Sequence, residues 1–303
     1  MISVLFGAGA SWDSERYAPR PPLGKDLFSE LNDLDGRYSK LSDVQKKEFK
    51  SGGFEVGMCF IPNDSEIINP LQIELALFLS KYEPTSDGAY VRLFKMLGSL
   101  RRKINILTLN YDLLIEKSLL LCGDKEVSYD EVQDTASVLK VHGSCNFVPD
   151  VHPGINIGKI VSVDCGTFVD TDRVRILQSH GDLESWSKSH HGKSFSPVMC
   201  LFNKEKRVVM NSSIIEGLKA RYSSVIKQSR YVFIVGVNYV PHDSHVWDCI
   251  FDSGAELIIV DPYPSEIFIS VLKDKNINHI LIKKGFYDSV KRLAGMIRVR
   301  MGK

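Results

Sequence analysis

Ile2-Ser3-Val4-Leu5-Phe6-Gly7-Ala8-Gly9-Ala10-Ser11 opens the chain and decides its fold. Residues 2–6 have the apolar character of a buried strand, and this strand ends directly at small residues. Small residues between a strand and a helix let backbone N–H groups approach a phosphate closely, and the helix adds the positive end of its dipole. The pattern favours a dinucleotide-binding turn. A tight packing turn that binds nothing also uses Gly-x-Gly, and the usual third glycine is absent here.

Apolar runs of strand length recur along the rest of the chain. They lie at residues 104–107, 138–141, 231–235, 257–260 and 279–282. Continuous apolar runs suit strands that are buried on both faces of a parallel sheet, with helices between them. The sequence therefore predicts an α/β fold, a Rossmann-like doubly wound parallel sheet.

Two long segments interrupt this alternation of strands and helices. Residues 27–100, approximately, have helical spacing of their apolar positions and are too long for a simple crossover, which predicts a helical insertion. Residues 145–210, approximately, are rich in Gly, Ser, Asp and His and predict a loop-rich insertion. We find no composition shift that divides the chain, so we expect a single domain over residues 1–303.

Charge and hydropathy exclude several classes of function. The 38 basic and 37 acidic residues give a net charge of +1, so no overall field attracts nucleic acid or an anionic membrane. The cluster Arg101-Arg102-Lys103 is interpreted as a solvated helix end. No apolar run approaches the ~20 residues that cross a bilayer, and no signal peptide is evident, which predicts a cytoplasmic protein.

The six cysteines are scattered singly, and none forms a C-x-x-C pair. This spacing argues against a structural zinc site. We therefore expect no bound metal and reduced thiols.

Polar residues follow four of the predicted strands at the end where ligands bind in open α/β sheets. They are Thr108, Asn110, Asp112, His142, Gly236, Asn238 and Asp261. Each has an ordinary explanation, because Asn110 or Asp112 suits a helix N-cap and a lone histidine is usually structural. His242, Asp243 and His245 also lie near the expected ligand face, but they suit the cap of the helix that follows and are left out of the catalytic set. The joint placement of these residues after strands favours a binding site.

In their order and spread, these motifs resemble the sirtuin-like superfamily of NAD-consuming enzymes. The elements that carry the resemblance are Gly7-Ala8-Gly9-Ala10-Ser11, Thr108-x-Asn110-x-Asp112, His142-Gly143, the Gly236 turn and Asp261. Two features depart from the protein deacylases of that family. Cys145 stands alone where a zinc ribbon has its first cysteine pair, and Leu109 replaces the usual Gln. The chain looks more like the bacterial sirtuin-like NAD hydrolases of antiviral defence, which lack the ribbon.

The resemblance implies a role for each motif. Asn110 would orient the ribose or a water, Asp112 would orient its neighbours or balance charge, and His142, with an unperturbed pKa of roughly 6.5, would accept a proton. The implied NAD-binding residues are Gly7, Ala8, Gly9, Ser11, Thr108, Gly236, Asn238 and Asp261.

The expected function is therefore an NAD glycohydrolase that releases nicotinamide and ADP-ribose, with NAD as substrate and without metal. Antiviral defence implies depletion of cellular NAD, and control of such an activity suggests a homo-oligomer or a separate sensor protein. No nucleic acid or membrane partner is expected. Two alternatives remain: a regulator that binds NAD or ADP-ribose without turnover, and a zinc-less protein deacylase.

Overall fold

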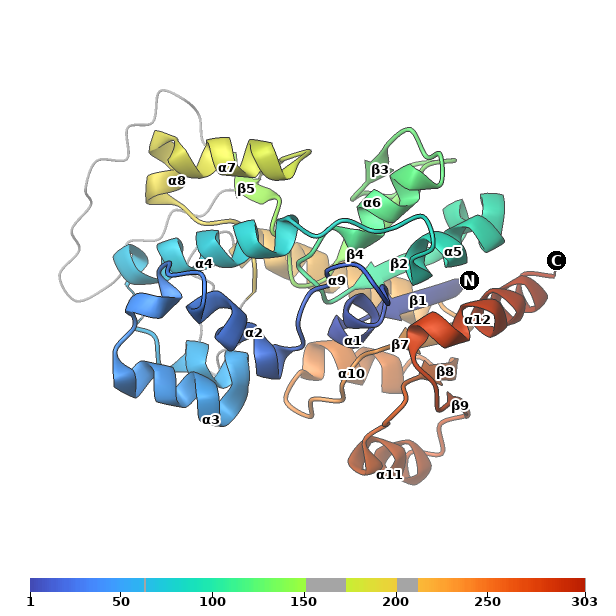
Figure 1. Ribbon diagram of the computed structural model, residues 1–303. Coiled ribbons are helices and arrows are strands. Elements are labelled where there is room, and N and C mark those ends of the chain that lie inside the picture. Colours follow the sequence, from blue (N-terminus) through green and yellow to red (C-terminus); the bar gives the residue numbers. More distant parts are fainter. Residues whose placement is uncertain (63, 151–172, 201–211, 303) are drawn as a thin grey trace.

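The structure is a computed structural model that describes residues 1–62, 64–150, 173–200 and 212–302. Within these residues seven strands form one parallel sheet in the order β3-β4-β2-β1-β7-β8-β9 (Figure 1). These strands are β1 (Ile2–Phe6), β2 (Asn105–Thr108), β3 (Val127–Ser128), β4 (Ala136–Lys140), β7 (Tyr231–Val235), β8 (Glu256–Val260) and β9 (His279–Ile282). A separate antiparallel pair joins β5 (Phe147–Pro149) and β6 (Val174–Ile176).

The predicted fold class is confirmed. Three of the predicted strands, β1, β7 and β9, have the bounds expected from their apolar runs. Two others differ in a way that matters for the site. β2 was expected at 104–107 and extends to Thr108, and β4 was expected at 138–141 but runs from Ala136 to Lys140. Both strands end in a polar residue, and these two residues pair with each other in the sheet. Apolar character alone does not mark such strand ends.

Helices cover both faces of the sheet. Alternate residues of a strand face opposite sides, so Val4 and Phe6 of β1 belong to one hydrophobic core and Leu5 to another. The first core is closed by α5 (Ala89–Leu97), α6 (Leu114–Leu121) and α12 (Phe286–Arg300). The second is closed by α9 (Ser212–Lys227), α10 (Ser244–Phe251) and α11 (Glu266–Asp274).

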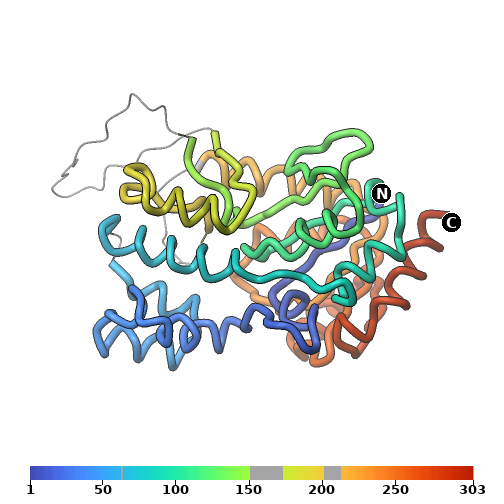
Figure 2. Tube along the Cα trace, turned by 45° about the horizontal axis from the view of Figure 1, so that its top comes forward, coloured from blue at the N-terminus to red at the C-terminus, as the bar shows by residue number. Residues whose placement is uncertain are grey.

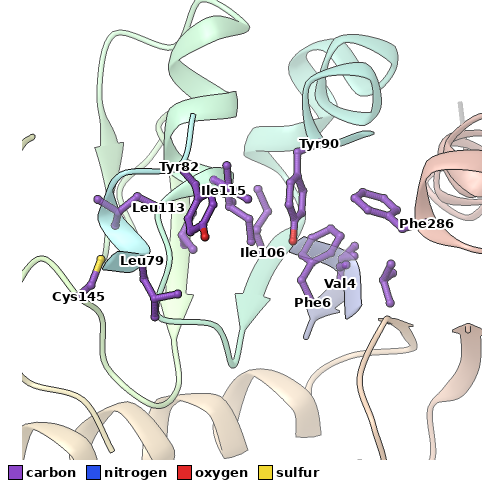
Figure 3. Packing of buried hydrophobic residues seen from close by; sticks show 14 of the residues in the cluster. Val4, Phe6, Leu79, Tyr82, Tyr90, Ile106, Leu113, Ile115, Cys145 and Phe286 are labelled. Carbon is purple, nitrogen blue, oxygen red and sulfur yellow. The ribbon is translucent and has the colours of Figure 1, made fainter. Parts of the chain in front are cut away.

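Aromatic rings fill the first core beside the central strand. Phe6 contacts the rings of Tyr90 and Phe286 edge-on or tilted, at centroid distances of 5.1 and 5.6 Å (Figure 3). Offset and edge-to-face pairs of this kind add to the stability that area burial provides. They join α5 and α12 to β1, the strand from which the Gly-x-Gly loop leaves.

The segment between β1 and β2 is helical. It contains α1 (Ala8–Trp12), α2 (Gly24–Asn32), α3 (Asp43–Cys59), α4 (Ser65–Ser80) and α5, with 3-10 turns at Tyr38–Lys40 and Gly98–Arg102. In Figures 1 and 2, α2, α3 and α4 extend to one side of the sheet, and both termini lie at the opposite end of the molecule.

The segment expected to be loop-rich contains two helices, α7 (His180–Lys188) and α8 (His190–Ser194). Both dock on α4: the Ser80 hydroxyl lies 2.8 Å from His180 Nδ1, and the Asn69 amide donates to the Ser194 carbonyl at 3.0 Å. Residues 151–172 and 201–211 of this segment lie outside the described residues. No helix in the described ranges is long and apolar enough to span a bilayer.

The interpretation of Arg101-Arg102-Lys103 as a solvated helix end is wrong for Arg101. Its guanidinium is buried, donates to Asp124 at 2.6 Å and also bonds the carbonyls of Gly98 and Cys122. Arg102 bonds the other oxygen of the same carboxylate. A buried charge requires such partners. The opposite charge comes from Asp124, which is twenty-three residues away in the chain.

Candidate active site

Strand order reverses between β1 and β7, because β2 lies on one side of β1 and β7 on the other. In doubly wound sheets ligands bind at the carboxyl ends of the strands beside such a switch point. The residues that leave β1 and β7 there are Gly7 and Gly236.

The two loops at the switch point touch through their backbones. The N–H of Gly7 donates to the Val235 carbonyl and the N–H of Gly9 donates to the Gly236 carbonyl at 2.9 Å. A Cβ on Gly7 would lie 2.6 Å from the Gly236 oxygen, and one on Gly236, which has φ +60°, would lie 2.2 Å from the Ala10 nitrogen. These glycines are therefore required by loop packing, whether or not a phosphate binds. Ala8 is the exposed residue of the first loop.

Asn110 joins this loop to the end of β2. Its Nδ2 donates to the Gly7 carbonyl and to the Ser11 hydroxyl, both at 2.9 Å. Thr108 positions it, because the buried Thr108 hydroxyl bonds the Phe6 carbonyl and accepts from the backbone N–H of Asn110. With both Nδ2 hydrogens used, the Oδ1 of Asn110 is the atom left to accept a hydrogen bond.

Asp112 faces a different set of partners. Its Oδ1 accepts from the N–H of Leu114 at the start of α6, and its backbone carbonyl accepts from the Lys140 ammonium group. Lys140 is 1% exposed and lies 3.1 Å from Glu116. Within the described residues, the hydrogen bonds of Asp112 lead to α6 and β4, and none reaches Asn110 or His142.

His142 lies in the loop that follows β4, and backbone hydrogen bonds to residues 198 and 200 hold this loop. Its carbonyl accepts from the N–H of Cys200 at 2.8 Å, and the N–H of Ser144 donates to Val198 at 3.0 Å. Gly143 lies between them with φ +80°, and a Cβ there would be 2.0 Å from the Val198 oxygen. The close approach of residue 198 thus accounts for the His-Gly pair and fixes the histidine backbone.

The imidazole of His142 contacts a second imidazole. Its Nε2 lies 2.8 Å from Nε2 of His245, and the ring centroids are 5.1 Å apart. Burial, the proximity of His245 and the positive charge of Lys219 lower the pKa of His142 to about 3. Burial and Lys219 likewise lower the pKa of His245 to about 4. Both rings are therefore neutral at pH 7, and His142 is a weaker base than its ordinary pKa indicates.

Asn238 and Asp261 lie after β7 and β8. Asn238 is exposed, whereas Asp261 is half-buried and accepts from the N–H of Tyr263 at 2.7 Å. Burial raises the pKa of the Asp261 carboxyl, partly offset by that hydrogen bond. One oxygen of Asp261 thus shapes the loop that follows β8.

The structure joins Gly7, Gly9, Ser11, Asn110 and Gly236 by direct contacts, and it connects His142 to a residue that the sequence interpretation assigned to a helix cap. His245 is the functional candidate missed. Asp243 is the N-cap residue of α10, as the capping interpretation expects, although its side chain makes no cap hydrogen bond.

The candidate site coincides with neither a metal-binding cluster nor a hollow of the described residues. Across the described ranges, no group of three or more His, Cys, Asp or Glu side chains is arranged to hold a metal ion. Two shallow hollows lie on α3, beside Lys46 and Lys50, and next to β6 and Trp186. Neither is lined by a residue of the candidate site.

No protein-family model matches the chain, and no curated protein matches its sequence. Solved structures do resemble it in fold. A Sir2 homologue in complex with NAD has a TM-score of 0.51 and 14% identity, over 99% of this chain and 90% of that one. A triple mutant of Sir2 homologues in complex with 2′-O-acetyl ADP ribose has a TM-score of 0.53 and 13% identity, over 100% and 93%. The chain therefore has a sirtuin-like fold.

Proposed function

We propose that this protein is an NAD glycohydrolase that cleaves NAD to nicotinamide and ADP-ribose. One observation carries the proposal: the amide of Asn110 is hydrogen-bonded to both Gly7 and Ser11 of the Gly-x-Gly loop. The expected catalytic amide and the expected dinucleotide loop are thus parts of one hydrogen-bonded unit at the switch point of the sheet. The similarity in fold to a Sir2 homologue solved with NAD supports the same ligand class.

The reaction requires few groups. The bond between ribose C1′ and the nicotinamide nitrogen breaks, its electron pair leaves with neutral nicotinamide, and water oxygen bonds to C1′. One proton of that water must be accepted and released to solvent. Asn110 Oδ1 is free to orient a ribose hydroxyl or the water, and His142 is neutral and able to accept the proton.

Purified protein incubated with NAD, with and without an acylated peptide, tests this function. We expect free nicotinamide in equal amounts in both reactions, measured by chromatography. Nicotinamide that forms only with the peptide supports the zinc-less deacylase instead. Binding of NAD or ADP-ribose by calorimetry without any nicotinamide supports a non-catalytic regulator. If the protein neither binds NAD nor releases nicotinamide, that result contradicts an NAD-dependent function altogether.

We further propose that the cleavage serves bacterial antiviral defence by depleting NAD in the cytoplasm, under control of a homo-oligomer or a separate sensor protein. The motif order that resembles that branch of NAD hydrolases supports this role. Cells expressing the protein should lose NAD after phage infection and restrict the phage, whereas cells expressing an Asn110→Ala variant should do neither.

Asp261 is proposed to hold the adenosine ribose. A carboxylate there accepts hydrogen bonds from ribose hydroxyls and repels a 2′-phosphate. Asp261→Ala should therefore raise KM for NAD roughly tenfold or more with little change in kcat. Steady-state kinetics with NAD and NADP measure both effects.

The Asp261→Asn variant is the matched control, since its amide oxygen retains the bond to the N–H of Tyr263. It should keep the loop and still lose discrimination against NADP. If KM and the preference for NAD stay unchanged in both variants, Asp261 only shapes the loop.

A further inference from the structure

The contact between His142 and His245 restricts where hydrogens can sit. Two neutral imidazoles whose Nε2 atoms are 2.8 Å apart share one hydrogen bond, so one Nε2 carries the hydrogen and the other accepts it. Each neutral ring has one N–H, so the tautomers of the two rings are linked in one of two arrangements. The ring that donates carries its hydrogen on Nε2, and the ring that accepts carries its hydrogen on Nδ1.

Only one of the two arrangements leaves His142 able to act as a base. If His245 donates, the hydrogen of His142 is on Nδ1 and its one lone pair is already occupied by His245. If His142 donates, its Nδ1 is bare. Within the described part of the chain Nδ1 of His142 has no hydrogen-bond partner, and the residue as a whole is partly exposed, so no described group occupies this nitrogen.

We propose that His245 is a positioning residue for His142: it accepts the Nε2 hydrogen of His142 and thereby makes Nδ1 of His142 the atom that takes the proton of the attacking water. This inference rests on the proposed NAD cleavage. When Nδ1 takes the proton, His142 becomes an imidazolium whose Nε2–H still donates to His245, and a hydrogen bond from a charged donor is stronger than one between neutral groups. The proton then passes to solvent.

Charged groups on α9 act on the protonation of the pair. Lys219 lowers the pKa of both rings, whereas Glu216 raises the pKa of His245. Lys219 and Glu216 themselves form an ion pair at 3.3 Å. The positive charge of Lys219 opposes protonation of the resting pair, so each ring keeps a single N–H.

Nitrogen NMR of ¹⁵N-histidine-labelled protein at pH 7 tests the tautomer directly, without NAD. We expect His142, assigned by its loss in His142→Ala, to carry hydrogen on Nε2 and none on Nδ1. In His245→Gln the amide oxygen can accept the same hydrogen and should preserve this tautomer, whereas His245→Leu should give a mixture. Hydrogen on Nδ1 of wild-type His142 contradicts the proposal.

Kinetics supply the second readout. His245→Leu should lower kcat roughly 10- to 100-fold, the range expected for one hydrogen bond to a charged group, with little change in KM. His245→Gln should retain most of the wild-type rate, as should His190→Gln, which changes an exposed histidine on α8. Equal losses in His245→Leu and His245→Gln would assign His245 a structural role. If the wild-type protein releases no nicotinamide, the proposed function fails, while the NMR result still decides the His142 tautomer.

Discussion

His142→Ala should reduce nicotinamide release by about 10²-fold, the low end of what a positioned general base contributes, because burial and nearby charge lower the pKa of this base. The imidazole is the neutral proton acceptor at the end of β4, and alanine leaves the water without one. Nicotinamide release at saturating NAD, followed by chromatography, measures the loss. KM should change little, because no bond of His142 reaches the Gly-x-Gly loop within the described residues.

The variant should keep its fold, since the ring makes one hydrogen bond and the backbone of residue 142 retains its own bond to Cys200. The free energy of unfolding, measured by thermal denaturation, should therefore change by no more than about 1 kcal/mol, the value of a typical hydrogen bond. Wild-type turnover in a folded His142→Ala protein removes this residue from the mechanism.

Lys140→Met should lower the free energy of unfolding by about 3–5 kcal/mol, the cost of leaving a buried charge without its partner. The ammonium group of Lys140 is 1% exposed, and it lies 3.1 Å from Glu116 and donates to the Asp112 carbonyl. Methionine nearly fills the volume but carries no charge and no donor, so Glu116 loses its ion-pair partner and the Asp112 carbonyl loses its hydrogen bond. Urea denaturation measures the change.

Two further variants separate charge from packing. Lys140→Met combined with Glu116→Leu should regain most of the lost stability, because no unpaired charge then remains in the interior. Lys188→Met removes a lysine from an exposed pair with Glu184 on α7 and should change stability by less than about 0.5 kcal/mol. An equal, small effect of Lys140→Met and Lys188→Met would mean that the buried pair contributes little.

The central strands of the sheet could be predicted from the sequence because they are buried on both faces and therefore consist of apolar residues. The strands at 2–6 and 231–235 are found within their true bounds for this reason. The strand at 279–282 lies at the edge of the sheet and is mostly half-buried, yet its apolar run Ile280–Ile282 also marked it correctly. The strand of residues 136–140 ends in a lysine whose inward orientation no local pattern indicates. Its partner, Glu116, lies on a helix that precedes the strand in the chain.

The site was predictable only in part. Strand ends identify Asn110 and His142, since polar residues after parallel strands gather at one edge. His245 was missed because its pairing depends on contact between the loop after β4 and the first turn of α10, which are 103 residues apart in the chain, while its local sequence suits a helix start. The same limit explains Arg101, whose partner Asp124 is identified by contact and not by spacing.

The central position of β1 affects how the chain folds during synthesis. β1 leaves the ribosome before both of the strands it pairs with, β2 and β7, and the sequence separation of Ser3 and Ser229, whose hydroxyls are bonded at 2.6 Å, is 226. At 5–20 residues per second, the second neighbour of β1 follows after roughly 10–45 seconds. Until then β1 keeps an unpaired apolar edge, which is prone to association with other chains. A nascent chain arrested before β7 should therefore bind chaperones or aggregate, whereas a released chain that includes β7 should not.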